Sequence, residues 1–431
     1  MRRGLTLLTA LLLSTAARAD DDWSIHVQST LVWQFQPSFH AAFTGPNSLK
    51  TDAEGRETFD ATLYAGRRLW DGGEVYANLE MDQGFGLSDT LGVAGFPSGE
   101  AYKVGANEPY IRLQRLFFRQ TFDLGGDSTN VDDGPNQVAG SHTADTLVLT
   151  GGKLSVGDVF DANSLAHDPR VDFLNWSLID TGTFDYAADA WGYTYGATAE
   201  WTQDWWTLRA ALFDLSRVPN TTQLVRGFGQ YEIVTEGEAR YKLFGQDGVA
   251  KLTGFLNRAR MASYNDAVAL GALTHTTPDV ALVRKPSDRA GFAMNATQGV
   301  TDDLSLFMRA GLNDGSKEAF EFTEINRTEA LGLALKGASW GRPDDVVGLA
   351  GVNNGISHSA SAYLRAGGLG ILIGDGALPH YADETILETY YSAAATKWLA
   401  VSLDYQFIDH PAYDADRGPA SVFGLRLHAT Y

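Results

Sequence analysis

Charged side chains recur at every second residue in parts of the chain, a spacing that gathers them on one face of a β-strand. Two such segments, residues 73–85 and 230–243, place them opposite their apolar residues. The candidates on these faces are Glu74, Glu80, Asp82, Glu236 and Arg240. Carboxylates accept hydrogen bonds from hydroxyl groups, and guanidinium groups donate them. The pattern predicts a polar surface suited to neutral, polyhydroxylated solutes, and a wall of paired charges without selectivity is the alternative.

Residues 110–123 add three arginines, Arg112, Arg115 and Arg119, which do not share one face of a regular strand. A β-bulge near Gln114 would shift the alternation by one residue and bring all three to the polar face. We therefore expect a bulge at this point if the three guanidinium groups line the same surface.

A long connecting segment, residues 159–190, is rich in side chains that could bind a polar solute. Its candidates are Asp161, His167, Asp168, Arg170, Asp172, Asn175 and Trp176. Folded against the charged strand faces, the segment would form a constriction whose aromatic rings stack on the C–H face of a sugar. The alternative is an external cap whose charges hydrogen-bond one another. We favour the constriction because Trp176 lies away from the strand ends, where most tryptophans occur.

Other chemistries find little support in the sequence. The chain has no cysteine, which excludes disulfides, thiolate nucleophiles and cysteine-bound metals. H-E-x-x-H does not occur, and the one G-x-S-x-G, at residues 337–341, lies between two expected strands without the strand-to-helix turn that exposes a nucleophile, so it does not complete a hydrolytic site with His167-Asp168. Acids outnumber bases by 53 to 33, which argues against a nucleic-acid partner. We expect no catalytic residue, no metal and no cofactor.

The N-terminus indicates export from the cytoplasm. A basic pair, Arg2 and Arg3, precedes an apolar run and the small-residue cleavage site Ala17-Arg18-Ala19. The apolar run is only about half as long as the roughly 20 residues that a membrane-spanning helix needs. We expect residues 1–19 to be a signal peptide and residues 20–431 to form a single domain.

Alternation of apolar and polar residues along the mature chain defines the fold class. Residues 23–35 and 422–431 show the period of two most clearly, and fourteen further segments give sixteen expected strands. Short turns alternate with long connections, and most of the ten tryptophans, Trp191 included, lie near expected strand ends. The sequence predicts an all-β fold, a 16-stranded antiparallel transmembrane β-barrel of a Gram-negative outer membrane, with short periplasmic turns and long external loops.

One connection departs from this arrangement. Residues 124–145 fall on the side of the short turns, yet they form a long segment rich in Gly, Asp and Asn. Nothing in the sequence explains this length. The segment is therefore expected to be an irregular periplasmic connection of unknown role.

Several motifs resemble the carbohydrate-selective porins of the OprB type. They are residues 69–76 (LWDGGEVY), 84–88 (GFGLS), 95–102 (GFPSGEAY), 115–122 (RLFFRQTF), 158–176 and 404–406 (DYQ). The resemblance extends over essentially the whole mature chain. It implies a sixteen-stranded outer-membrane barrel for passive diffusion of glucose and similar sugars, without assigning the residues that touch the sugar.

Three functions thus stay open at this stage. The first is a sugar-selective porin, the second a general porin or one selective for organic acids, and the third an outer-membrane hydrolase. The expected partners are small sugars and outer-membrane lipid, and the sequence does not decide between a monomer and a trimer.

Overall fold

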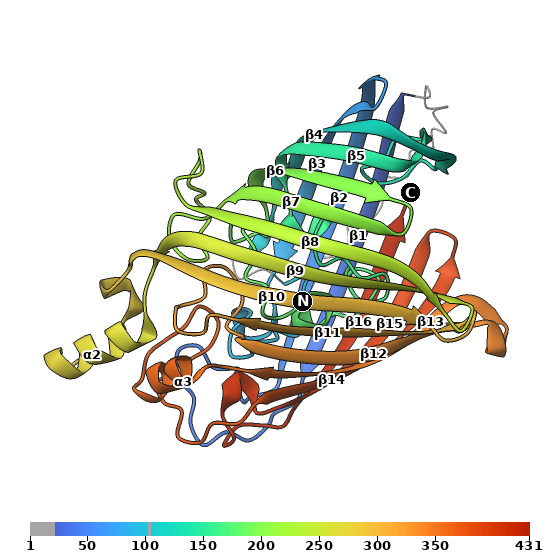
Figure 1. Ribbon diagram of the computed structural model, residues 1–431. Helices are drawn as coiled ribbons and strands as arrows, with labels where there is room; N and C mark the ends of the chain where they lie inside the picture. Colours follow the sequence, from blue (N-terminus) through green and yellow to red (C-terminus); the bar gives the residue numbers. More distant parts are fainter. Residues whose placement is uncertain (1–21, 102–104) are drawn as a thin grey trace.

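The computed structural model describes residues 22–101 and 105–431, which form a closed antiparallel barrel of sixteen strands (Figure 1). Each strand pairs with its neighbours along the chain, and β1 pairs with β16. A closed sheet has no free edge, so its backbone groups are satisfied without water, as a bilayer demands. The predicted fold class is confirmed. The strands are β1 (Trp23–Gln36), β2 (Glu54–Trp70), β3 (Gly73–Gly84), β4 (Ala106–Val131), β5 (Gly140–Leu154), β6 (Thr194–Gln203), β7 (Trp206–Asp214), β8 (Tyr231–Leu243), β9 (Gln246–Met261), β10 (Lys285–Gly299), β11 (Leu304–Asn313), β12 (Arg327–Gly337), β13 (Arg342–Gly355), β14 (Glu384–Thr396), β15 (Leu399–Asp409) and β16 (Ala420–Thr430).

The two ends of the barrel differ. At the end where β1 begins and β16 ends, most neighbouring strands are joined by short turns such as Asp71-Gly72. The opposite end carries the long loops, with α2 (Tyr264–Thr274) projecting from it and α3 (His358–Arg365) beside the rim (Figure 1). We call these the periplasmic and the external end, as predicted. No helix in the described part of the chain is long and apolar enough to cross a membrane. The predicted signal peptide lies outside the described residues.

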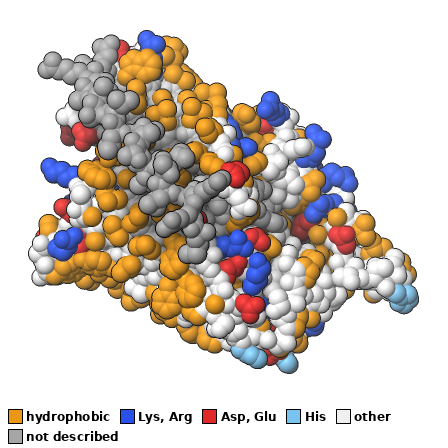
Figure 2. Space-filling view, turned by 180° about the vertical axis from the view of Figure 1, so that it is seen from behind, with side chains coloured by type: hydrophobic (Ala, Val, Ile, Leu, Met, Phe, Trp, Pro, Cys, Tyr) orange, Lys and Arg blue, Asp and Glu red, His pale blue; other side chains and the backbone are white. Residues whose placement is uncertain are grey.

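The alternation read from the sequence sets which side chains face the bilayer. Along β3, Asn78, Glu80 and Asp82 point inward and are buried, whereas Leu79 between them is 46% exposed on the outside. Hydrophobic side chains cover much of the barrel wall on the face shown in Figure 2. Turning the charges outward would cost several kcal/mol per ion, because lipid offers them no hydrogen bonds. The lumen therefore collects the polar residues, as predicted for this strand.

The three arginines of β4 reach the lumen through a bulge. Asn78 of β3 lies opposite Arg115, but the next residue of β3, Leu79, lies opposite Leu113, so Gln114 is the extra residue. On either side of the bulge, Arg112 faces Glu80 across the strands and Arg119 faces Glu74. Both glutamates are on the inward face. The predicted bulge near Gln114 is confirmed.

The expectation of an irregular connection at residues 124–145 is wrong. Here β4 continues to Val131 and β5 starts at Gly140, so only residues 132–139 connect the two strands. This part of the hairpin lies beyond the neighbouring strands and has no apolar face turned to lipid. Its residues therefore do not alternate between apolar and polar, and this alternation was the signal used to predict strands.

The connection between β5 and β6, residues 155–193, lies inside the barrel and is tied to the far wall. One tie is an ion pair between Asp185 and Arg289 of β10, both with fully buried side chains. Asp185 also accepts hydrogen bonds from the backbone N–H groups of Phe320 and Glu321, at 2.8 and 2.9 Å. This carboxylate thus joins the inner loop, the barrel wall and the loop between β11 and β12.

Replacing Asp185 by alanine should destabilise the folded barrel by about 3–5 kcal/mol, because Arg289 would keep its charge in a buried place without a partner. Chemical unfolding of the protein refolded in lipid vesicles measures this change. The matched control is Asp288→Ala, which breaks an ion pair with Arg258 that is about half exposed on the barrel surface. That change should cost less than about 1 kcal/mol. Equal, small losses for both variants would contradict the structural role of Asp185.

Candidate channel constriction

The inner loop crosses the lumen because side chains of the wall bind its backbone. Leu174 and Asn175 donate their N–H groups to Glu388 of β14, at 2.5 and 2.9 Å. Arg426 of β16 donates to three carbonyl oxygens of the loop, at distances of 2.6 to 2.9 Å. Arg309 of β11 binds Asp161 at 2.5 Å, and its other nitrogen reaches two further carbonyls. These contacts hold the loop as a fixed partition within the barrel.

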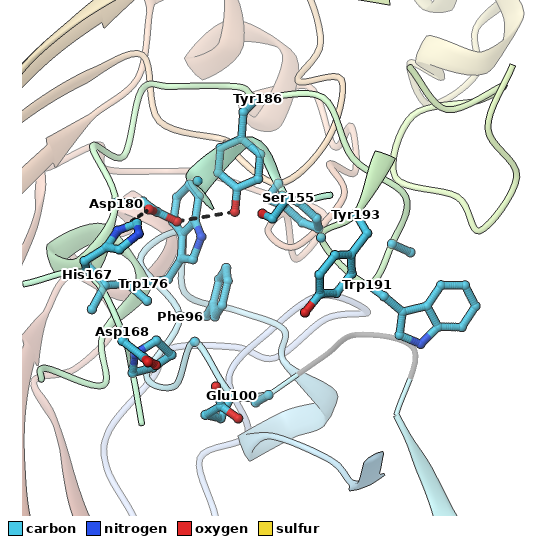
Figure 3. A pocket seen from close by; sticks show the side chains of 18 of the residues that line it. Phe96, Glu100, Ser155, His167, Asp168, Trp176, Asp180, Tyr186, Trp191 and Tyr193 are labelled. Carbon is cyan, nitrogen blue, oxygen red and sulfur yellow. Dashed lines mark hydrogen bonds and ion pairs between the residues drawn. The ribbon is translucent and has the colours of Figure 1, made fainter. Parts of the chain in front are cut away.

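A cavity of about 300 Å³ remains between this loop, the β3–β4 loop and the wall of β4 (Figure 3). Five of the predicted candidates line it, drawn from the loop and from β4. They are Arg115, His167, Asp168, Arg170 and Trp176. The structure thus brings together the centre of the candidate loop and one arginine of the bulged strand.

One wall of this region is organised around the guanidinium of Arg170. Its Nε atom lies 3.3 Å from Asp60 of β2 and 3.4 Å from Glu100 of the β3–β4 loop, and its Nη2 atom lies 3.1 Å from Glu80. Burial raises the pKa of Glu100 well above its usual range, so its carboxyl favours the protonated form beside the other acids. Because one cation serves three acids, the balance of charge at this wall depends on Arg170.

The opposite wall combines arginine with aromatic rings. Arg115 forms a two-pronged ion pair with Asp158, at 2.8 and 2.6 Å, and its guanidinium also lies over the ring of Tyr193. Although burial opposes ionisation, the guanidinium holds the pKa of Asp158 below its ordinary value. Next to this pair, Arg112 lies 3.3 Å from the ring centre of Trp191. Cation–π contact keeps both the arginines and the rings in place.

Aromatic and polar groups also meet at the third side of the cavity. Trp176 stacks on Phe96 with ring centres 5.3 Å apart, and both rings point into the space drawn in Figure 3. His167 lies 3.9 Å from Asp180, which accepts a hydrogen bond of 3.3 Å from Tyr186. Within the described residues, no serine hydroxyl hydrogen-bonds to His167. The cavity can therefore offer donors, acceptors and ring faces to one small solute at once.

The remaining candidates lie elsewhere in the structure. Asp161, Asp172, Asn175 and Glu236 are engaged in holding the inner loop: Glu236 accepts the N–H of Asp161, and Asp172 accepts the N–H groups of His167 and Asp168. Other candidates belong to the barrel wall outside the cavity, next to the lining or nearer the periplasmic end. They are Glu74, Glu80, Asp82, Arg112, Arg119 and Arg240.

Several lining residues were not among the candidates. Glu100 and Asp158 stand within the porin-like motifs, but their side-chain roles depend on loops that meet only in the fold. Trp191 was expected at a strand end facing the membrane interface, and this is wrong, because β6 begins only at Thr194, Trp191 is among the residues that border the cavity, and its indole packs against Arg112. Its neighbour Tyr193 lines the cavity with it. In the sequence, the cluster of aromatic residues at 184–193 could have indicated these lining residues.

Comparison with known proteins agrees with this architecture. The profile described as "Carbohydrate-selective porin, OprB family" matches residues 46–431. Porin AaxA of Chlamydia caviae is 21% identical over 417 residues, which cover 96% of this chain and 72% of that protein. Among solved structures, Pseudomonas putida OprB at high pH superposes with a TM-score of 0.74 at 17% identity, covering 96% and 95% of the two chains. The channel DcaP of Acinetobacter baumannii gives a TM-score of 0.52 at 11% identity, covering 95% and 97%.

The profile match extends over most of the chain, and the sixteen-stranded barrel is the fold of the Pseudomonas porin. The resemblance seen in the motifs is thereby confirmed. The chain belongs to the OprB family of carbohydrate-selective porins, which are outer-membrane channels of Gram-negative bacteria.

Proposed function

We propose that sugars cross the outer membrane passively through the cavity between Arg170 and Trp191, and that this cavity is the selective constriction of the channel. The observation that carries the proposal is the composition of its lining: guanidinium groups, carboxylates and the aromatic residues Trp176, Trp191 and Tyr193 border one space of about 300 Å³. That volume is at the lower end of the range for small-molecule sites. It suits a monosaccharide better than a large oligosaccharide.

The chemistry of the lining favours neutral over charged solutes. The arginines are paired with acids, as in Arg115–Asp158 and Arg170–Glu80, so the cavity has polar groups without a ladder of one sign. A hydroxylated solute can replace water at these groups, and it can place its apolar face on an aromatic ring. Passage also requires release, so binding must stay weak. Arginines and acids that already pair with each other bind a solute only weakly, so they meet this requirement.

We further propose that the cavity has no hydrolytic role. His167 interacts with Asp180 rather than with the adjacent Asp168, and although Ser155 lines the same cavity, no serine hydroxyl within the described chain hydrogen-bonds to His167. Assays with glycosides and sugar esters should show no turnover by the purified protein. Turnover that disappears in His167→Ala would contradict this part of the proposal.

Liposome swelling tests the main proposal directly. Glucose and a disaccharide are compared with an amino acid and an organic acid of matched size. Faster uptake of the sugars than of their size-matched rivals is expected. Rates that follow size alone would indicate a general diffusion porin, and faster uptake of the acid would indicate an organic-acid channel.

Replacing Arg170 by glutamine should lower glucose uptake several-fold, because a charged hydrogen-bond donor is lost from the lining of the cavity. The same change removes one positive charge that lies within 3.4 Å of three acids, Asp60, Glu80 and Glu100, so the channel should shift toward cation preference. Swelling rates and the reversal potential in a salt gradient measure the two effects. Arg258→Gln, on the outside of the barrel, is the matched control and should change neither. If Arg170→Gln had the swelling rates and the reversal potential of the wild type, Arg170 would not be part of the constriction.

Replacing Trp191 by alanine should lower glucose uptake without lowering ion conductance, because the ring face is lost while the opening becomes wider. Trp191→Tyr keeps an aromatic face and should restore part of the uptake. Swelling rates and single-channel conductance are compared for both variants, with the exposed Trp205→Ala as control. Glucose uptake that rises in step with conductance would show that Trp191 only limits the width.

A further inference from the structure

The hairpin of β4 and β5 extends beyond the barrel at its periplasmic end (Figure 1). The last backbone pair between β3 and β4 is Gly73 with Gln120, and the last pair between β5 and β6 is Thr146 with Thr202. Past these points the two strands pair only with each other, up to Val131 and Gly140. Closure of the barrel needs no such extension, since the neighbouring β2–β3 hairpin turns within two residues.

The extension bends at two glycines. Gly125 and Gly126 have φ angles of +130° and +85°, and the register between the strands shifts on both sides of Gly125. Residues other than glycine rarely adopt these angles, and irregular pairing bends a two-stranded ribbon. The bend returns the tip, residues 132–139, to the barrel.

The tip is seated against the inner wall of the lumen. On β1, Ser24 donates to the carbonyl of Gly134 at 2.9 Å, and the His26 ring lies 3.0 Å from the Asp133 carboxylate. Three further contacts come from inward-facing side chains of β2, β3 and β4. They are Arg68 to the Ala139 carbonyl at 2.5 Å, the Val138 N–H to the Tyr76 hydroxyl at 3.3 Å, and Arg119 to the Asn136 carbonyl at 3.0 Å.

An apolar contact completes this seat. The Val138 side chain is only 3% exposed and packs in one cluster with Tyr76 and Phe117 of the inner wall. The tip is thus fixed at four neighbouring strands by both polar and apolar contacts. Asp132, Asp133 and Gln137 remain exposed to the solvent of the mouth.

We propose that residues 132–139 form a second constriction, at the periplasmic exit, which limits the size of permeating solutes and favours cations over anions. This inference rests on the proposed passive channel, because it assigns a second filter to the same path. The tip occupies part of the mouth, and its exposed carboxylates add negative charge there. A ring or cluster of acids at a pore favours cations.

The first test removes the tip. Residues 124–145 are replaced by Asn-Gly, which joins Asp123 to Thr146, residues that already pair across the hairpin. Single-channel conductance in planar bilayers should rise by about twofold or more, because the narrow segments of a pore act in series. Uptake of a disaccharide should rise more than uptake of glucose. A folded variant, verified by its heat-modifiable migration on gels, with wild-type conductance would overturn the proposal.

The second test keeps the hairpin and changes only charge. Asp132→Asn with Asp133→Asn should shift the reversal potential in a salt gradient toward anions. The control pair, Asp247→Asn with Asp302→Asn, removes the same charge from the start of β9 and from the β10–β11 turn, at the same end of the barrel but outside the tip. If the reversal potential shifted equally in the two double variants, or did not shift in either, the proposed cation preference of the periplasmic exit would be overturned. This test decides the matter if the shortened variant does not fold.

The third test checks the seat itself. The chain has no cysteine, and a side chain at Gly134 would meet no atom within 4 Å, so Ser24→Cys with Gly134→Cys introduces the only two thiols, with free space between them. A short thiol-specific cross-linker should join them and leave conductance unchanged, because the tip already lies there. Failure of this cross-link to form would overturn the seating of the tip. Ion conductance does not depend on sugar recognition, so these results stand apart from the outcome of the glucose measurements.

Discussion

Everything in this structure depends on the need to satisfy backbone and charged groups in a bilayer. The closed sheet provides the backbone hydrogen bonds, and the alternation along each strand sends apolar side chains to lipid. The charged side chains of the strands are thereby concentrated in the lumen. Since the barrel is too wide for side chains alone to fill, its loops enter and share this polar interior.

The carboxylates of the wall hold these loops through one repeated contact, in which a carboxylate accepts backbone N–H groups. Glu388 does so with Leu174 and Asn175, and Glu384 does so with Ala94 and Gly95. A charge-assisted bond of this kind is stronger than a bond between neutral groups. These acids of the lumen therefore act as anchors for the loops.

The cavity is the space left between the loop segments that these carboxylates hold. Between the β3–β4 loop and the inner loop, Arg170 binds acids from two strands and a loop, while Arg115 binds Asp158 in another wall of the cavity. Fixed pairs of opposite charge and stacked rings give a surface that exchanges hydrogen bonds with water or with hydroxyl groups. The family to which the chain belongs is defined by carbohydrate selectivity, and we propose this lining as the physical basis of that selectivity.

The sequence by itself determined the features that depend on neighbours along one strand. Alternation in residues 23–35 and the unequal spacing of Arg112, Arg115 and Arg119 were enough to predict the barrel and the bulge at Gln114, because each residue's face follows from the one before it. The motifs then indicated the family. None of this required contacts between distant segments.

Only the tertiary structure decided which polar residues face the channel. Asp161 and Glu236 hold a loop in place, and Trp191 lies in the loop that borders the cavity rather than in a strand. The tip of the β4–β5 hairpin contacts the inner wall at the mouth. Each outcome depends on partners far apart in the chain, such as Asn175 and Glu388, which are 213 residues apart. A local pattern marks such side chains as polar, but it carries no information about the partner that the fold brings to them.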